Sequence, residues 1–192
     1  ITKADDLYNL NTLGFRGEAL ASIASVSEVE MKTKYAQEDT GTRIIIEAGN
    51  FINQENTAAT QGTSIAVKNL FYNIPARKNF LKSISVETKH TFEEFQRIAL
   101  SYPGITFEYY NQGKNQSKLE SGNLEKRIHD LFNLKEDELI TTNEDTDIVE
   151  IKGFIGTPKI SKRTRGNQYL FANGRFIKDP YLNHAIISGY SN

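Results

Sequence analysis

Hydrophobic and polar positions along the chain repeat with two different periods, and the change between them predicts a mixture of strands and helices. In residues 29–35, Val29, Met31, Thr33 and Tyr35 alternate with charged side chains, which is the period of a half-exposed strand. In residues 87–104, Phe92, Phe95 and Ala99 share one face of a helix. The same patterns predict further strands within 41–54, 62–71, 105–111 and 147–156, and further helices at 18–25, 73–83, 123–132 and 181–189.

Turn-forming residues divide these segments. Asn173-Gly174 favours a hairpin over residues 169–178, because a tight turn needs positive φ at both of its central positions. A second turn is expected at Gly49-Asn50. Asp179-Pro180 is typical of a helix start, with the aspartate as the cap and the proline in the first turn.

The order of these elements predicts an α+β protein with mixed or mostly antiparallel sheets. No internal repeat or low-complexity tract interrupts the pattern. We expect two domains, residues 1–85 and 86–192, because the short helix at 73–83 is followed by a break before the long one.

Composition excludes several classes of protein. The 24 acidic and 23 basic residues leave a net charge of −1, so attraction to DNA must come from a local patch. Cysteine is absent, which excludes disulfides and thiolate metal sites, and the histidines at 90, 129 and 184 lack the spacing of a metal pair. There is no apolar run of the roughly 20 residues that a membrane helix needs and no secretory signal, so we expect a cytoplasmic protein.

A glycine-flanked turn precedes the helix expected at 18–25. The start of a helix presents unpaired amides and about half a positive charge, which together attract phosphate. Gly14 and Gly17 allow close approach to the backbone, Arg16 adds positive charge, and Glu18 is expected in the first helical turn. The alternative is an ordinary structural turn, which is the commoner meaning of so short a motif.

Three longer strings resemble successive motifs of the MutL family of DNA mismatch repair proteins. They are GFRGEALASIASVS, QGTSIAVKNLFYNIPARKNFL, and QYLFANGRFIKD followed by NHAI, and they occur in the family's order. The resemblance implies part of a GHKL ATPase α/β sandwich, a fold shared with type II topoisomerases, heat-shock chaperones and histidine kinases. A second α/β domain, similar to domain 2 of ribosomal protein S5, is expected to follow it.

The resemblance also implies a nucleotide site. In the family, the first string closes the lid over ATP and its backbone amides meet the phosphates. A threonine hydroxyl of the second string lies near the adenine. Carried over to this chain, nucleotide binding falls to Gly14, Phe15, Arg16, Gly17, Glu18 and Thr63.

Other parts of the family's ATP site do not occur in this chain. We find no counterpart of the general-base glutamate, the magnesium-binding asparagine, the adenine-reading aspartate or the γ-phosphate lysine. The resemblance therefore implies ATP and Mg²⁺ binding by the full-length protein, whereas we expect no catalytic residue, metal ligand, bound cofactor or ATP hydrolysis in these 192 residues alone. The chain starts at Ile1 and its only methionine is Met31, so we expect a processed product or a piece of a longer polypeptide.

Three cations, Arg77, Lys78 and Lys82, lie at the end of the second string and directly after it. Family members usually have a lysine where this chain has Asn79, which weakens a phosphate-binding role for the block. We expect it to be structural, with Phe71, Phe80 and Leu81 packed where the two domains meet.

Six further cations lie within twenty residues, with aromatic side chains among them and only Asp179 adjoining with opposite charge. They are Lys159, Lys162, Arg163, Arg165, Arg175 and Lys178. Such a cluster can follow a phosphate backbone, although it is also typical of a solvated loop and hairpin edge. MutL proteins bind DNA without sequence preference, so the resemblance favours DNA, with Arg175 and Lys178 as the best candidates.

The resemblance implies further partners for the full-length protein. These are MutS, a downstream nuclease and helicase, and a second copy of the protein when ATP binds, at the bacterial nucleoid. Two rival hypotheses remain: a non-catalytic DNA-binding module, and another GHKL ATPase such as a type II topoisomerase subunit. The glycine pattern of the lid argues against the topoisomerase.

Overall fold

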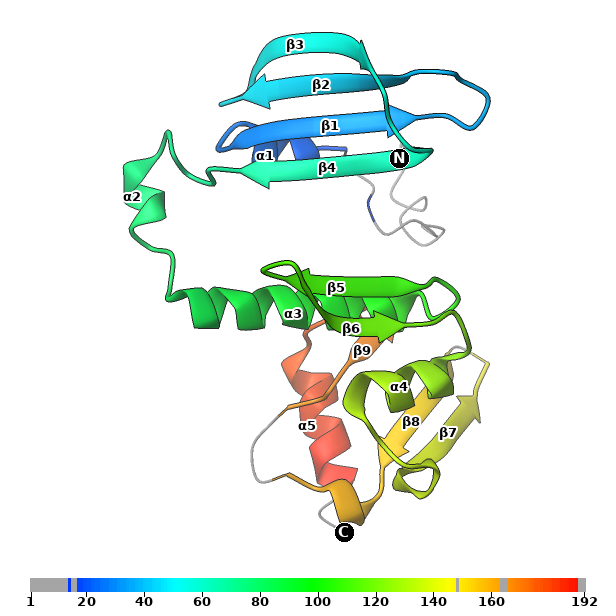
Figure 1. The fold of residues 1–192 in the computed structure, drawn as a ribbon. Coiled ribbons are helices and arrows are strands. Elements are labelled where there is room, and N and C mark those ends of the chain that lie inside the picture. Colours follow the sequence, from blue (N-terminus) through cyan, green and yellow to red (C-terminus); the bar gives the residue numbers. More distant parts are fainter. Residues whose placement is uncertain (1–13, 15–16, 148, 163–165, 190–192) are drawn as a thin grey trace. The chain divides into compact units, whose positions relative to one another are not determined.

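The structure, a computed structural model, describes residues 14, 17–147, 149–162 and 166–189 (Figure 1). The chain separates into two units, residues 1–87 and 88–192, so the division falls within the long helix α3 (Ile84–Ser101). Both units combine helices with antiparallel strands, which confirms the predicted α+β class.

The first unit is built on a four-stranded antiparallel sheet in the order β3-β2-β1-β4. Alternation along β1 places Val29, which is buried, on the face opposite to Glu30. Helix α1 contacts β1, and α2 follows β4 with Pro75 in its first turn, as predicted. The elements are α1 (Ala19–Ala24), β1 (Glu28–Lys34), β2 (Gly41–Glu47), β3 (Asn50–Thr57), β4 (Gly62–Lys68) and α2 (Pro75–Lys78).

The turn between β2 and β3 lies one residue earlier than the sequence predicted. Its central residues are Ala48 and Gly49, with φ of 48° and 82°, because the flanking Glu47 pairs with Asn50. This position lets the Ala48 and Gly49 amides donate to carbonyls of the segment 24–27, at 3.1 and 2.9 Å. Tertiary hydrogen bonds therefore decided the position of the turn.

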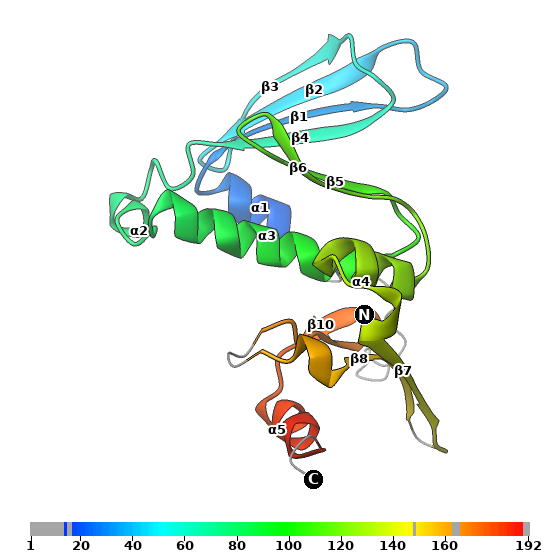
Figure 2. The same ribbon diagram turned by 60° about the horizontal axis from the view of Figure 1, so that its bottom comes forward.

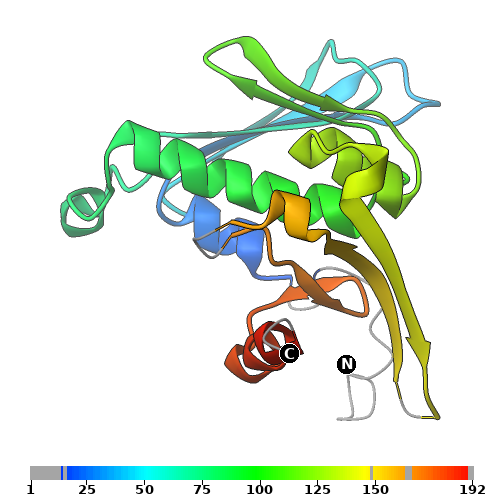
Figure 3. The same cartoon turned by 90° about the horizontal axis from the view of Figure 1, so that it is seen from below.

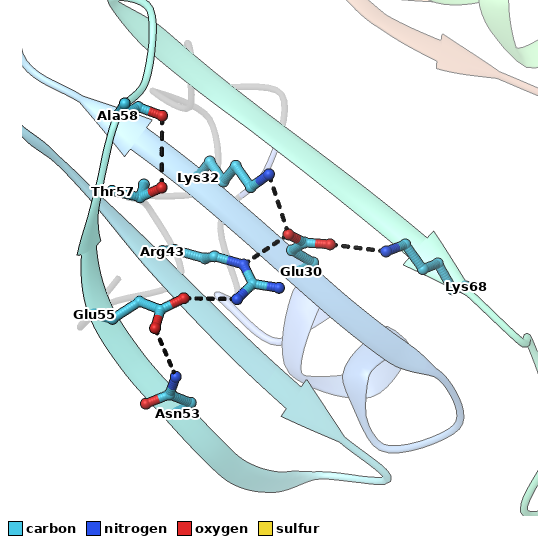
Figure 4. A network of polar contacts seen from close by, with 8 residues as sticks. All are labelled: Glu30, Lys32, Arg43, Asn53, Glu55, Thr57, Ala58 and Lys68. Carbon is cyan, nitrogen blue, oxygen red and sulfur yellow. Dashed lines mark hydrogen bonds and ion pairs between the residues drawn. The ribbon is translucent and has the colours of Figure 1, made fainter.

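An ion-pair network covers the polar face of the sheet (Figure 4). The Glu30 carboxylate accepts hydrogen bonds from Lys68 Nζ at 2.7 Å and Arg43 Nε at 2.8 Å, and Lys32 Nζ lies 3.3 Å away. Arg43 also reaches Glu55 at 2.6 Å. Hydrogen bonds from Lys68, Arg43 and Lys32 lower the pKa of Glu30 to about 2 from an ordinary value of 4.5.

Acid is expected to destabilise the first unit through Glu30. A carboxyl whose pKa is lower in the folded state contributes stability above its unfolded pKa, and loses that contribution as the pH falls through the folded value. Stability should therefore decline as the pH falls from 4.5 to about 2. Urea unfolding across this range, followed by circular dichroism, should show a smaller decline for Glu30→Gln. The exposed Glu38→Gln is the control, and equal profiles for both variants would contradict the prediction.

In the second unit, the hairpin of β5 (Phe107–Asn111) and β6 (Lys114–Leu119) lies beside α3 (Figure 2). Aromatic rings pack between the helix and this hairpin. Phe92 and Phe95 of α3 stack with ring centroids 5.6 Å apart, and Tyr109 of β5 meets Phe92 edge-on at 5.2 Å. The sequence predicted the shared helical face but not β6, because Leu119 is its only apolar residue. Pairing with β5 makes this polar segment a strand.

A buried arginine ties α4 (Leu124–Phe132) to this hairpin. Arg127 is 1% exposed, and its Nη2 donates to the carbonyls of Pro103, Ile105 and Glu120 at 2.8, 2.5 and 3.2 Å. Its guanidinium carbon also lies 5.4 Å from the centre of the Phe107 ring. One side chain thus joins the segment after α3 to the segment before α4.

Two hairpins and a helix complete the unit (Figure 3). As predicted, Asn173 and Gly174 form a turn at φ of 49° and 76°, and Asp179 Oδ1 caps the last helix by accepting from the Leu182 amide at 2.8 Å. The strand β7 was not predicted. The elements are η2 (Glu136–Glu138), β7 (Leu139–Asp145), β8 (Glu150–Gly156), η3 (Pro158–Ile160), β9 (Leu170–Ala172), β10 (Arg175–Ile177) and α5 (Pro180–Gly189).

Some apolar side chains of the predicted elements are exposed. Ile151 of β8 is 54% exposed, and β8 pairs only with β7 among the strands that the structure describes. Phe80, expected to pack between domains, is 79% exposed in the loop after α2. Within the described ranges, no helix is long and apolar enough to cross a membrane.

Candidate functional site

The turn before α1 is open to solvent. Gly17 has φ of 68°, and a Cβ built there would meet no heavy atom within 4 Å. Glu18 is the N-cap of α1 rather than a first-turn residue as predicted, because its carbonyl accepts the first helical bond from the Ser22 amide at 2.9 Å. Gly14 is also exposed, whereas Phe15 and Arg16 lie outside the described residues. The start of α1 is therefore exposed and follows directly after a glycine with open space around it.

Thr63 presents an exposed hydroxyl at the start of β4. It pairs across the strands with Thr33, and the two hydroxyl oxygens are 2.9 Å apart. The register of β1 with β4 fixes its place in the sheet.

The residue types at these two positions suit different parts of a nucleotide. Unpaired helix amides beside an open glycine suit a phosphate, and a threonine hydroxyl suits a polar ring edge. Among the residues that the structure describes, no group of three or more histidine, cysteine, aspartate or glutamate side chains is placed to hold a metal ion.

The cations predicted to bind DNA differ in their surroundings. Lys162 and Lys178 are exposed, Arg175 is partly buried in β10, and Arg163 and Arg165 lie outside the described residues. Lys159 Nζ forms an ion pair with Asp137 at 2.5 Å, which raises the pKa of the lysine. The charge pattern around Lys159 gave no sign of this acidic partner, because Asp137 lies in η2, far from the cluster along the chain.

A cavity of about 470 Å³ in the second unit brings together Lys178 and two cations that the sequence analysis did not select. Lys89 and Arg97 line it from α3, and the Arg97 guanidinium stacks on the Phe176 ring at 4.4 Å. Lys89, Glu93 and Arg97 recur every four residues, so they share one helical face. This spacing in the sequence could have predicted that Lys89 and Arg97 lie on the same side of α3.

Comparison with known proteins gives relatives along almost the whole chain. A family model described as DNA mismatch repair protein, C-terminal domain, matches residues 132–192. The DNA mismatch repair protein MutL of Flavobacterium psychrophilum is 51% identical over 99% of this chain, and that of Bacteroides fragilis is 39% identical over the same share. The chain spans 31% of the length of each relative.

Solved structures share the fold. The Aquifex aeolicus MutL ATPase domain complexed with ADP has a TM-score of 0.77 and 27% identity, covering 97% of this chain and 70% of that one. A further structure of the A. aeolicus MutL ATPase domain has a TM-score of 0.72 at 24% identity, covering 91% and 68%. These matches confirm the GHKL ATPase fold predicted from the sequence motifs.

Proposed function

This chain belongs to the MutL family of DNA mismatch repair proteins, and we propose that its first unit forms one edge of the ATP site of the complete protein. The similarity to the family extends over almost the whole chain. The open turn at Gly17 carries this proposal, because it leaves space beside the backbone at the start of α1, where the family places phosphate. The ADP in the matched A. aeolicus domain supports it. Gly14, Phe15, Arg16, Glu18 and Thr63 complete the edge in this proposal.

Each described residue of the edge has a distinct part in binding. Gly17 lets a phosphate approach the backbone, and the first amides of α1 donate hydrogen bonds to its oxygens. The Thr63 hydroxyl can donate to or accept from a ring nitrogen of adenine. Bound ATP would supply the triphosphate charge that these amides attract, and Mg²⁺, held by other parts of the protein, would neutralise part of it.

These 192 residues alone are expected not to hydrolyse ATP. Water activation needs a base within hydrogen-bond reach, and we identify none in the chain. A malachite-green assay on the purified chain should give the rate of a blank without protein. The full-length protein serves as the positive control, and turnover by the chain above the blank would contradict this prediction.

We further propose that the second unit binds DNA through Lys159, Lys162, Arg163, Arg165, Arg175 and Lys178, without sequence preference. The exposure of Lys162 and Lys178 supports it. Lys89 and Arg97 line one cavity with Lys178, but they pair with Glu93 and Glu94. Lys159 is the weakest of the proposed contacts, since Asp137 already pairs with it. This proposal also covers the alternative that the chain acts only as a DNA-binding module.

DNA affinity of the chain should fall steeply with salt, with a logarithmic slope of about −0.9 for each phosphate contact. Lys178→Glu is expected to weaken binding equally for different sequences and to reduce the slope by about 1. Lys152→Glu is the matched control, because Lys152 lies in β8 and pairs with Glu150. Fluorescence anisotropy with labelled duplexes measures both quantities. Binding that stays constant from low to high salt would rule out the phosphate contacts.

In the complete protein, we propose that ATP binding orders the lid and promotes dimerisation, which relays mismatch recognition by MutS to a nuclease and helicase. Order–disorder switching of this type is a known physical mechanism. Family membership favours this function over a type II topoisomerase subunit. The bacterial relatives support action on chromosomal DNA in the cytoplasm, at the nucleoid.

A further inference from the structure

The segment that joins α1 to β1 accepts hydrogen bonds at four successive carbonyls. The Gly49 and Ala48 amides donate to the carbonyls of residues 24 and 27, at 2.9 and 3.1 Å. The Phe71 amide donates to the carbonyl of residue 26 at 2.7 Å, and Asn73 Nδ2 donates to that of residue 25 at 3.0 Å. The carbonyls at the end of a helix lack partners within it, so these donors complete the end of α1.

The loop that supplies two of these donors has a strained backbone. Phe71 has φ of 62°, which is rare for a bulky side chain, and Asn69 has φ of 51°. Asn69 Nδ2 donates to Glu28 Oε2 at 2.8 Å, which holds the loop beside the start of β1. Strain of this kind persists only where surrounding contacts enforce it, and it clusters at functional sites. The sequence of this block predicts only a packing role for it.

Helix α1 depends on these bonds for its orientation. It has six residues, too few to be stable alone, and only Ala24 is buried within it. Leu20 and Ile23 are 42% and 38% exposed, so side-chain packing holds the helix weakly. The hydrogen bonds at its C-terminal end therefore fix where its other end, with Gly17, lies.

We propose that Phe71 and Asn73 are positioning residues for the ATP site, which act by holding α1. This inference rests on the proposed function, because it assigns a consequence to the place of Gly17. Neither residue contacts the nucleotide in this proposal.

Asn73→Asp tests this proposal, because it removes the amide donor at almost unchanged size. In the chain without nucleotide, the α1 amides should exchange hydrogen for deuterium about five- to tenfold faster. In the full-length protein, KM for ATP should rise about fivefold with kcat within about twofold, since the variant displaces a binding edge only. Asn79→Asp is the control for the added charge. It is exposed at the end of α2 and should change neither quantity.

The two measurements test the positioning role and its link to the ATP site separately. Unchanged exchange in α1 overturns the positioning role, whatever happens to ATP turnover. Faster exchange with unchanged KM overturns the link to the ATP site. Fewer active molecules, as after general misfolding, would lower kcat and leave KM unchanged, which also counts against the proposal. Gly17→Val tests the site directly, so failure of the proposed function is recognised separately from failure of this inference.

Discussion

Replacing Arg127 with methionine is expected to lower the free energy of unfolding of the second unit by about 3 kcal/mol. Methionine fills a similar apolar volume, but the carbonyls of Pro103, Ile105 and Glu120 lose their common donor. Hydrogen bonds to a charged group contribute about 1.5–3 kcal/mol each. Relief of a buried charge offsets part of this loss, and burial accordingly lowers the pKa of Arg127.

Lys126→Met is the matched control for Arg127→Met. Lys126 neighbours Arg127 on α4, but its side chain is 51% exposed and its ion pair with Asp130 lies at the surface. Exposed pairs contribute about 0–1 kcal/mol, so the control should stay close to the parent chain. Urea unfolding followed by circular dichroism compares the three proteins. Equal unfolding midpoints for the two variants would show that the hydrogen bonds from Arg127 to the three carbonyls do not stabilise the second unit.

Local sequence patterns predicted the elements whose side chains alternate clearly between apolar and polar. The Asn173-Gly174 hairpin and the Asp179 cap followed from residue chemistry that acts within a few positions. Strand β6 is polar and becomes a strand through pairing with β5. Arg127 is buried because three carbonyls from distant segments converge on it. Interactions between remote segments leave no signal in a window of ten residues.

The candidate site was predictable only in part, for the same reason. Motif resemblance selected Gly17 and Thr63, which the structure places at exposed positions. It also selected the second string, but gave no sign that Phe71 and Asn73 reach the end of α1, because that contact joins positions about 48 residues apart. Likewise, the charge of Lys159 is balanced by Asp137, 22 residues away. Charge runs read along the chain overstate how many cations are available to a ligand.

Gly17→Val is expected to lower the affinity of the full-length protein for ATP, and its turnover at low ATP, by about tenfold or more. Gly17 has φ of 68°, where an L-residue is strained by about 1–2 kcal/mol, and a β-branched residue is strained more. A Cβ at this position meets nothing within 4 Å, so the effect would come from a changed backbone rather than a clash. The turn would relax away from φ of 68° and turn the first α1 amides from the phosphates.

Gly113→Val separates this effect from general destabilisation. Gly113 has φ of 73° and an equally open surrounding, but it lies in the turn between β5 and β6 of the second unit. Both variants carry the same strain, so both should lower the melting temperature, whereas only Gly17→Val should weaken binding of a fluorescent ATP analogue. Gly17→Asn should recover most of the affinity, because asparagine tolerates positive φ, as it does at Asn173 of this chain. An affinity of Gly17→Val equal to that of the parent protein would show that the phosphates bind elsewhere.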